Sequence, residues 1–108
     1  MQPMSQEINR QAIKKVLERV GKHEGVVGTV LCDMYGLPLQ STMSPDDSEA
    51  ISAQVGSLVG KIKNVSHDIT GELPRTIRIE TSNGDVEIIP DFSTEINIVA
   101  LIQRRGAK

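Results

Sequence analysis

The side chains that most often bind metals or act as nucleophiles are few and scattered in this sequence. His23 and His67 each lack a second His or Cys at the spacing of a zinc site. Cys32, the only cysteine, follows an apolar run, and no neighbouring basic residue would lower the pKa of its thiol toward a reactive value. We therefore expect no metal site and interpret Cys32 as a packed residue of a strand.

The carboxylates and glycines form no catalytic or nucleotide-binding motif either. Asp46 and Asp47 directly follow a Ser-Pro pair, where acidic side chains stabilise the positive end of a helix, and this explains them without catalysis. Gly25 and Gly28 belong to neither a G-x-G-x-x-G nor a G-x-x-x-x-G-K-[ST] phosphate loop, and no serine lies in a G-x-S-x-G elbow. The sequence thus predicts a protein that is not an enzyme and holds no cofactor.

The composition excludes further classes of protein. The 108 residues include 12 Lys and Arg against 14 Asp and Glu, with one Tyr, one Phe and no Trp. Nucleic-acid binding needs a basic surface or aromatic platforms for stacking, so we expect no nucleic-acid partner. The longest apolar stretch near the end, Ile98–Ile102, is far shorter than the roughly 20 residues of a membrane span, so direct membrane insertion is not expected. A single cysteine and the lack of a secretory signal pattern favour a cytoplasmic setting.

The elements that position these residues begin with an amphipathic helix. The length suits one domain of residues 1–108, with a core at about residues 5–103. Ser5 is a good N-cap, and Gly21 is a natural stop that favours a left-handed residue after the last turn. Between them, one side of the helix collects apolar residues at spacings of three and four: Ile8, Ala12, Ile13, Val16, Leu17 and Val20.

A hairpin follows this helix. Residues 26–31 are apolar and β-branched, residues 33–36 form a turn that begins with Asp and ends with Gly, and residues 37–42 alternate as a returning strand. Pro38 cannot donate a ladder hydrogen bond, so the second strand is predicted to lie at an edge of the sheet.

A second helix is predicted over Pro45–Lys63, with a loop or a frayed end after it. Its sheet-facing stripe is apolar, whereas roughly opposite lies a stripe of small residues formed by Ala53, Gly56, Ser57 and Gly60. Each glycine costs about 1 kcal/mol relative to alanine, so another backbone should approach closely here. That backbone belongs either to a loop or the first helix of the same chain, or to the same helix of a second copy in a dimer.

Three further strands complete the fold. Residues 76–81 alternate strictly, an Asn-Gly turn lies within Ser82–Asp85, and residues 86–89 run back, while residues 96–103 are almost continuously apolar and suit a central strand. The fold class is therefore α+β, a three-layer α/β/α sandwich with five antiparallel strands in the element order α-β-β-α-β-β-β. If residues 76–81 lie at an edge, this strand can pair with its own copy, and the opposite charges of Arg78 and Glu80 suit antiparallel pairing.

Several stretches together resemble the roadblock family of dynein light chains. They are Gly25–Gly28, Gly36–Met43 with its Gly-Leu-Pro-Leu-Gln-Ser-Thr run, and Ile98–Gln103, and the similarity spans about Ile8 to Gln103. Ser82–Asp85 and its flanking strands are also similar to the roadblock-fold subunits of the lysosomal Ragulator scaffold.

The resemblance implies a profilin-like roadblock fold and a dimer built from the second helix and the third strand. It also implies a non-catalytic scaffold, a homodimer or a heterodimer with a related chain, that docks on and regulates a nucleotide-hydrolysing partner. A Ras-like small GTPase is the first expectation, and a light chain that bridges dynein intermediate chains is the alternative. Carried over by position, the interface residues would be Ala53, Gly56, Ser57, Gly60, Ile77, Arg78, Ile79 and Glu80.

A small-molecule sensor is the alternative from a different class of function. Such a module needs a cavity with a few convergent polar groups. The bulky aliphatic residues of the predicted core should instead fill the interior, so this alternative ranks below the scaffold.

Overall fold

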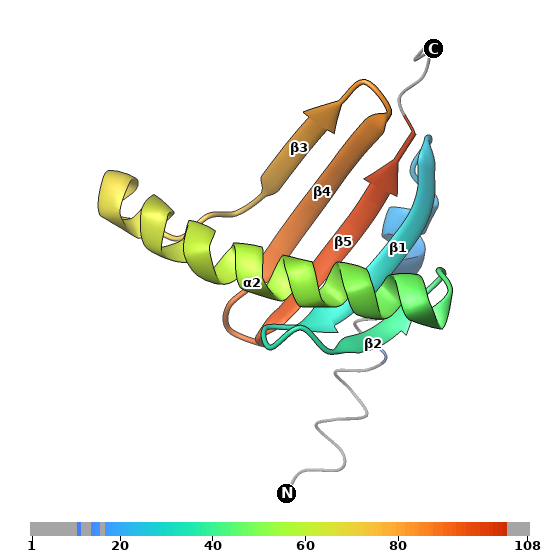
Figure 1. The fold of residues 1–108 in the computed structure, drawn as a ribbon, viewed down its shortest axis with the longest axis horizontal. Coiled ribbons are helices and arrows are strands. Elements are labelled where there is room, and N and C mark those ends of the chain that lie inside the picture. The colour runs from blue at the N-terminus through green and yellow to red at the C-terminus, as the bar shows by residue number, and fades with distance from the viewer. Residues whose placement is uncertain (1–10, 12–13, 16, 104–108) are drawn as a thin grey trace, which may run out of the picture.

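The computed structural model describes residues 11, 14–15 and 17–103, and it contains five strands and one long helix in this part of the chain (Figure 1). The predicted cap at Ser5 and the first turns of the first helix lie outside the described residues, whereas residues 17–21 are helical. The remaining elements are β1 (Val26–Asp33), β2 (Pro38–Ser41), α2 (Pro45–Thr70), β3 (Ile77–Thr81), β4 (Gly84–Asp91) and β5 (Ile96–Ile102).

The strands form one sheet in the order β2-β1-β5-β4-β3, and every neighbouring pair is antiparallel. The last strand in the sequence is therefore the central one, as its nearly continuous apolar run predicted. Val99 of β5 pairs with Val30 on one side and Ile88 on the other, and all three are buried. β2 and β3 form the two edges, which confirms the prediction for the strand with Pro38 and meets the condition under which residues 76–81 could pair with their own copy.

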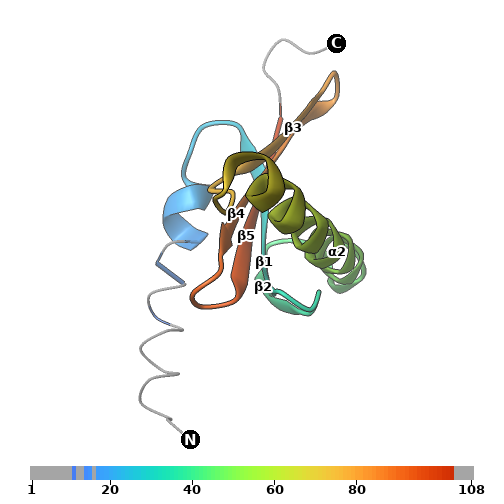
Figure 2. The same ribbon diagram turned by 90° about the vertical axis from the view of Figure 1, so that its left-hand side faces the viewer.

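Two helical layers cover the sheet, one on each face (Figure 2). Val55 and Val59 of α2 pack on Val30, Cys32 and other aliphatic residues of one face. Residues 17–21 lie on the opposite face, and Leu17 among them is buried. The predicted α+β, three-layer architecture is confirmed, including the element order.

The first helix ends differently from the prediction. Gly21 is still helical and does not take a left-handed conformation, and the chain reaches its first positive φ at Gly25. The backbone N–H groups of Lys22 and His23 donate to the carbonyls of Arg19 and Val20, so a tightened last turn satisfies these carbonyls without a left-handed glycine.

α2 is one and a half to two turns longer than the sequence analysis predicted. It begins as expected, with the Ser44 hydroxyl accepting from the Asp47 N–H at 3.1 Å, but it continues past Lys63 to Thr70. The predicted end was wrong because no Gly or Pro interrupts the chain between residues 64 and 70. Gly71 then stops the helix in a left-handed conformation with φ 79, and its N–H donates to the His67 carbonyl.

The β3–β4 turn also differs in detail. Its two loop residues are Ser82 and Asn83, flanked by the paired residues Thr81 and Gly84, so the Asn-Gly dipeptide is not the centre of the turn. Thr81 fixes this geometry, because its hydroxyl accepts from the Asn83 N–H and donates to the Gly84 carbonyl. No helix among the described residues is both long enough and apolar enough to cross a membrane.

Candidate dimerisation surface

The two edges of the sheet differ in their capacity to accept another strand. β3 pairs with β4 in regular register over five residues and contains neither proline nor a bulge. β2 has only four residues, begins with Pro38, and shifts register opposite Leu31 and Cys32. Short strands, prolines and bulges protect an edge from pairing with other chains. β3 is therefore the open edge, and it carries the four predicted interface residues Ile77, Arg78, Ile79 and Glu80.

The charged residues of β3 already have partners within the chain. The guanidinium of Arg78 contacts Glu80 through Nε at 3.1 Å, Asp85 through Nη2 at 3.2 Å and Glu87 through Nη1 at 3.0 Å. Asp85 is buried, whereas Arg78 and Glu80 are half exposed. The opposite signs of Arg78 and Glu80 are thus explained by an ion-pair cluster on one β-hairpin, with no need for a second copy.

The small residues of α2 have two different environments. Ala53, Ser57 and Gly60 are exposed on the side of the helix away from the sheet, but Gly56 is half-buried. A Cβ atom at Gly56 would lie 2.9 Å from the Gly36 nitrogen and 3.0 Å from its Cα. The close backbone approach is therefore made by the β1–β2 turn, the intramolecular alternative of the sequence analysis. The predicted role of Gly56 between two chains stays a prediction.

The sequence analysis missed an exposed apolar surface at the end of α2. Val65 and Ile69 are 50% and 77% exposed, and Leu73, just after the helix, is 44% exposed. Figure 1 shows that this end of α2 extends past β3 and has no strand of the same chain beside it. We call residues Val65–Thr70 the overhang. Its signal was present in the sequence, because Val55, Val59, Ile62, Ser66 and Ile69 continue one stripe at alternating spacings of four and three.

The overhang follows from the relative sizes of helix and sheet. The 26 residues of α2 span about 39 Å, whereas five strands spaced about 4.8 Å apart span about 19 Å. α2 starts beside β2 at one edge, so it must extend beyond β3 at the other. The sheet-facing stripe then continues where this chain has no sheet to cover.

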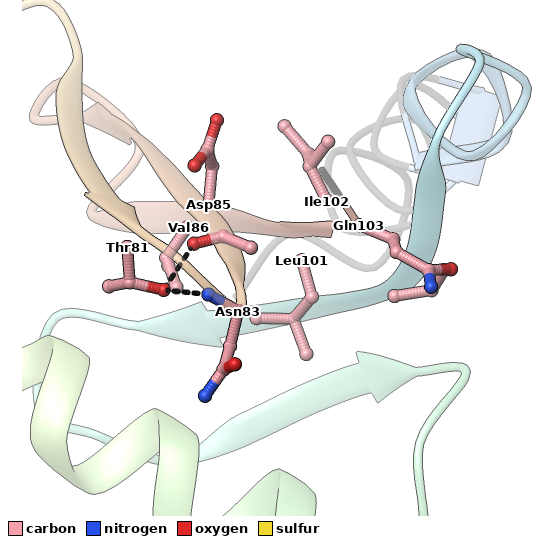
Figure 3. Close-up of a pocket in the computed structure, with 9 residues that line it drawn as sticks. Thr81, Asn83, Asp85, Val86, Leu101, Ile102 and Gln103 are labelled. Carbon is pink, nitrogen blue, oxygen red and sulfur yellow. Dashed lines mark hydrogen bonds between the residues drawn. The ribbon is translucent and has the colours of Figure 1, made fainter. Parts of the chain in front are cut away.

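A complementary bare region lies on the sheet itself. The upper ends of β3, β4 and β5 rise past α2 with no helix over them (Figure 1). An open hollow of about 490 Å³ lies here, and Val86 and Leu101 line it from the α2 side (Figure 3). Ile79 of β3, which pairs with Val86, is 41% exposed. The hollow has aliphatic side chains for packing against another apolar surface, and polar residues lie beside them: the lining comprises Val27, Val86, Leu101 and Ile102 together with Thr81, Asn83, Gly84, Asp85 and Gln103.

The residues considered for chemistry do not come together. Cys32 is fully buried in the core, and this burial raises the pKa of its thiol. His23 and His67 are exposed. Among residues 11, 14–15 and 17–103, no three His, Cys, Asp or Glu side chains are grouped in a way that could hold a metal ion.

A comparison with known protein families now supplies the context for this geometry. The family model of the Roadblock/LC7 domain matches residues 12–100. The chain belongs to this family. The match includes β1 to β4, α2 and most of β5, so the resemblance inferred from short stretches holds for nearly the whole sequence.

Solved roadblock structures have the same fold. A Roadblock/LC7 domain from Streptomyces avermitilis superposes with a TM-score of 0.72 at 16% identity, covering 84% of this chain and 75% of that one. MglB from Myxococcus xanthus gives 0.76 at 14% identity, covering 87% and 77%. An MglB structure described as having a tetrameric arrangement gives 0.70 at 12% identity, covering 86% and 71%.

The structure places the predicted interface residues of this roadblock domain in two separate groups. Ile77, Arg78, Ile79 and Glu80 lie together on the open edge of the sheet. Ala53, Ser57 and Gly60 lie on the outer side of α2, opposite the residues that cover the sheet. Two helices that lie on the same face of one continuous sheet contact each other through their flanks, so pairing through β3 does not by itself bring the outer stripes together.

Proposed function

We propose that this chain is a non-catalytic roadblock platform of the cytoplasm that dimerises through β3 and the overhang and that holds or regulates a Ras-like small GTPase. The second copy is either an identical chain or a related roadblock chain. The main observation in support of the dimer is the overhang, which continues the apolar stripe of α2 past the last strand of its own sheet.

If β3 pairs with β3 of a second copy, the overhang gains a sheet surface to cover. Antiparallel pairing in one plane joins two sheets into one, with the second sheet beginning where the first ends. The overhang of each copy then lies over the sheet of the other. There it meets the bare region around Ile79, Val86 and Leu101, so the exposed apolar residues of one copy cover those of the other.

The charges on β3 are compatible with this arrangement. Arg78 is saturated by carboxylates of its own hairpin, so the contact is carried by backbone hydrogen bonds and by aliphatic side chains. Ala53 and Ser57 remain proposed helix–helix contacts, in a dimer or with a partner, because pairing through β3 leaves them uncovered. Gly60 remains a proposed contact with a partner.

Family membership supports the GTPase part of the proposal. As the sequence resemblance implies, roadblock chains work in pairs on a nucleotide-hydrolysing partner. The GTPase is proposed to bind across both copies of the dimer, with about 800 Å² buried per side in a contact of standard size.

Solution mass tests the dimer directly. Static light scattering on the wild-type chain should give twice the chain mass at micromolar concentration. The double variant Ile69→Ser with Ile79→Lys, both at exposed positions, should give a folded monomer. Leu39→Ser is the matched control, since Leu39 is an equally exposed apolar residue on the protected β2 edge, and this variant should stay dimeric. A double variant that stays dimeric contradicts the proposal, whereas a monomeric wild type contradicts the homodimer and leaves a related roadblock chain as the second copy.

Nucleotide dependence tests the partner. A Ras-like GTPase of the same cell, loaded with GDP or with a non-hydrolysable GTP analogue, is titrated with the wild-type dimer and followed by fluorescence anisotropy. Binding should favour one nucleotide state by at least tenfold and should be lost with the monomeric double variant. Equal binding of both states, or equal binding by monomer and dimer, contradicts a regulatory platform.

A further inference from the structure

A small pocket lies on the side of α2 opposite the flank that the overhang presents to a second copy. It has a volume of about 190 Å³ and is bounded by the β1–β2 turn, the middle of α2 and the β4–β5 turn. Met34, Val59 and Phe92 form apolar walls, and Lys63 and Glu95 supply one charge of each sign. This volume is too small for an ordinary ligand pocket of about 300–1,000 Å³ and suits a single large side chain.

The floor of the pocket contains a glycine that the chain itself does not explain. Gly56 is needed because the β1–β2 turn packs against it, but nothing lies within 4 Å of a Cβ placed on Gly60. A glycine inside a helix is unfavourable relative to alanine, and here no contact within the described residues compensates for it. The bare space above Gly60 is therefore open to a group from outside the chain.

The pocket also contains the aromatic residues of the sequence. The chain has one Tyr and one Phe, and both Tyr35 and Phe92 line this site. Tyr35 is 81% exposed at the rim, and exposed tyrosines beside a pocket are typical of protein-binding sites. The Lys63 ammonium lies 5.6 Å from the centre of the Phe92 ring, close enough for a cation–π contact.

The walls of the pocket are fixed before any partner binds. Asp33 holds the first turn by accepting from the Tyr35 and Leu37 N–H groups, each at 2.9 Å. Asp91 holds the second turn by accepting from Ser93, through both its N–H and its hydroxyl. The Met34 N–H donates to the Glu95 carbonyl at 3.1 Å and joins the two turns. Such preorganisation lowers the entropy lost on binding.

We infer that this pocket receives one aromatic side chain with a hydrogen-bond donor, a Tyr or a Trp, from a protein partner that is not a second copy of this chain. The ring would fill the space above Gly60 and lie against Phe92, and the Lys63 ammonium would complement its electron-rich face. The Glu95 carboxylate would accept the phenol O–H or indole N–H. In the proposed dimer a second copy lies along the other flank of α2, so its aromatic residues do not reach this pocket.

This inference adds a contact point to the proposed platform, but it requires neither the dimer nor the GTPase. Partner binding through the pocket is compatible with dimerisation because the two surfaces lie on opposite flanks of α2. The test therefore uses small probes on the full chain, and its failure leaves the proposed function standing.

The probes are 4-methylphenol and 3-methylindole, the side-chain analogues of Tyr and Trp, with isobutanol as an aliphatic control. Each is titrated into ¹⁵N-labelled protein, and the amide signals are followed by NMR. Both aromatic probes should shift Gly56, Gly60 and Phe92 with a Kd in the millimolar range that suits so small a ligand. Isobutanol should shift them much less. Aromatic probes that leave these signals unmoved, or isobutanol that binds as well as they do, would overturn the inference.

Variants make the assignment specific. Gly60→Leu fills the pocket and should weaken both aromatic probes at least tenfold, and Lys63→Gln should weaken them several-fold. Ser57→Leu, on the outer stripe of the same helix but outside the pocket lining, should leave binding unchanged. Unchanged binding in Gly60→Leu overturns the inference. So does a change of mass in Gly60→Leu by light scattering, because Gly60 would then belong to the contact between two copies.

Discussion

The beginning and the end of α2 share one apolar stripe but have opposite relations to the rest of the fold. In the first half, Ser48, Ser52 and Val55 are buried, and the β1–β2 turn approaches Gly56 so closely that no side chain fits. In the second half, the same stripe continues through Ile62 to Ile69, which is 77% exposed. The helix as far as Val59 thus packs on its own chain, and only the overhang is left for a second chain. The difference teaches that a regular amphipathic pattern does not reveal which sheet it covers.

The largest change in stability is expected when two glycines of α2, one turn apart, are compared. Gly56→Leu should destabilise the fold by about 2–3 kcal/mol, because its side chain must displace the backbone of Gly36. Gly60→Leu, with open space around it, should leave stability unchanged or slightly raised. Urea unfolding followed by circular dichroism measures both. If both variants unfolded at the same urea concentration, Gly56 and Gly60 would not differ in how closely the rest of the chain packs against them.

A second test compares two aliphatic residues on the same stripe. Val59→Ala should cost about 2 kcal/mol of folding free energy, since Val59 is 1% exposed in the core. Ile69→Ala should cost less than about 0.5 kcal/mol in dilute, monomeric protein. It should nevertheless weaken dimerisation about tenfold, equivalent to about 1.4 kcal/mol. Unfolding at low concentration and sedimentation at high concentration separate these effects, and a large loss of monomer stability in Ile69→Ala would contradict the assignment.

A third test uses the thiol beneath the first half of α2. Burial raises the pKa of Cys32, so the unfolded chain loses this proton at a lower pH than the folded chain does. Stability should therefore fall as the pH rises above about 8.5, by at most about 1.4 kcal/mol per pH unit from this group. Cys32→Ala should lower stability at neutral pH but remove this part of the alkaline loss. If the free energy of unfolding falls equally steeply with rising pH in wild type and variant, the thiol ionises equally in the folded and the unfolded chain.

The prediction with the smallest expected effect concerns Gly60, which lies between the buried part of α2 and the overhang. Gly60→Ala should raise the free energy of unfolding by about 0.5–1 kcal/mol, because alanine is a better helix former and its methyl group meets nothing. Ser57→Ala is the control on the same exposed side, and it should change stability less. A destabilised Gly60→Ala would mean that the space above Gly60 is filled in the folded chain.

Sequence reasoning succeeded where local patterns determine structure. The alternation of residues 76–81 correctly predicted a strand, and the proline of β2 and the apolar run of β5 correctly predicted an edge strand and the central strand. It failed at the end of α2, because the loosened pattern after Asn64 concealed the continuing spacing of Val65 and Ile69. It assigned Gly56 and Gly60 to one stripe, although only the tertiary approach of Gly36 distinguishes them. The pocket depends on two turns that meet only in the folded sheet, so no local pattern could predict it.

The central position of β5 has a consequence for biosynthesis. β1 and β4 are not neighbours, and each is joined to the sheet's other half only through residues 96–102. During synthesis the two hairpins, β1–β2 and β3–β4, emerge first and remain separate until this strand arrives between them. Val30 and Ile88 lack their common β5 neighbour Val99 during that interval. The nascent chain is therefore most exposed to misassembly just before the final strand leaves the ribosome, and the β3 edge takes its place in a complete sheet only after that.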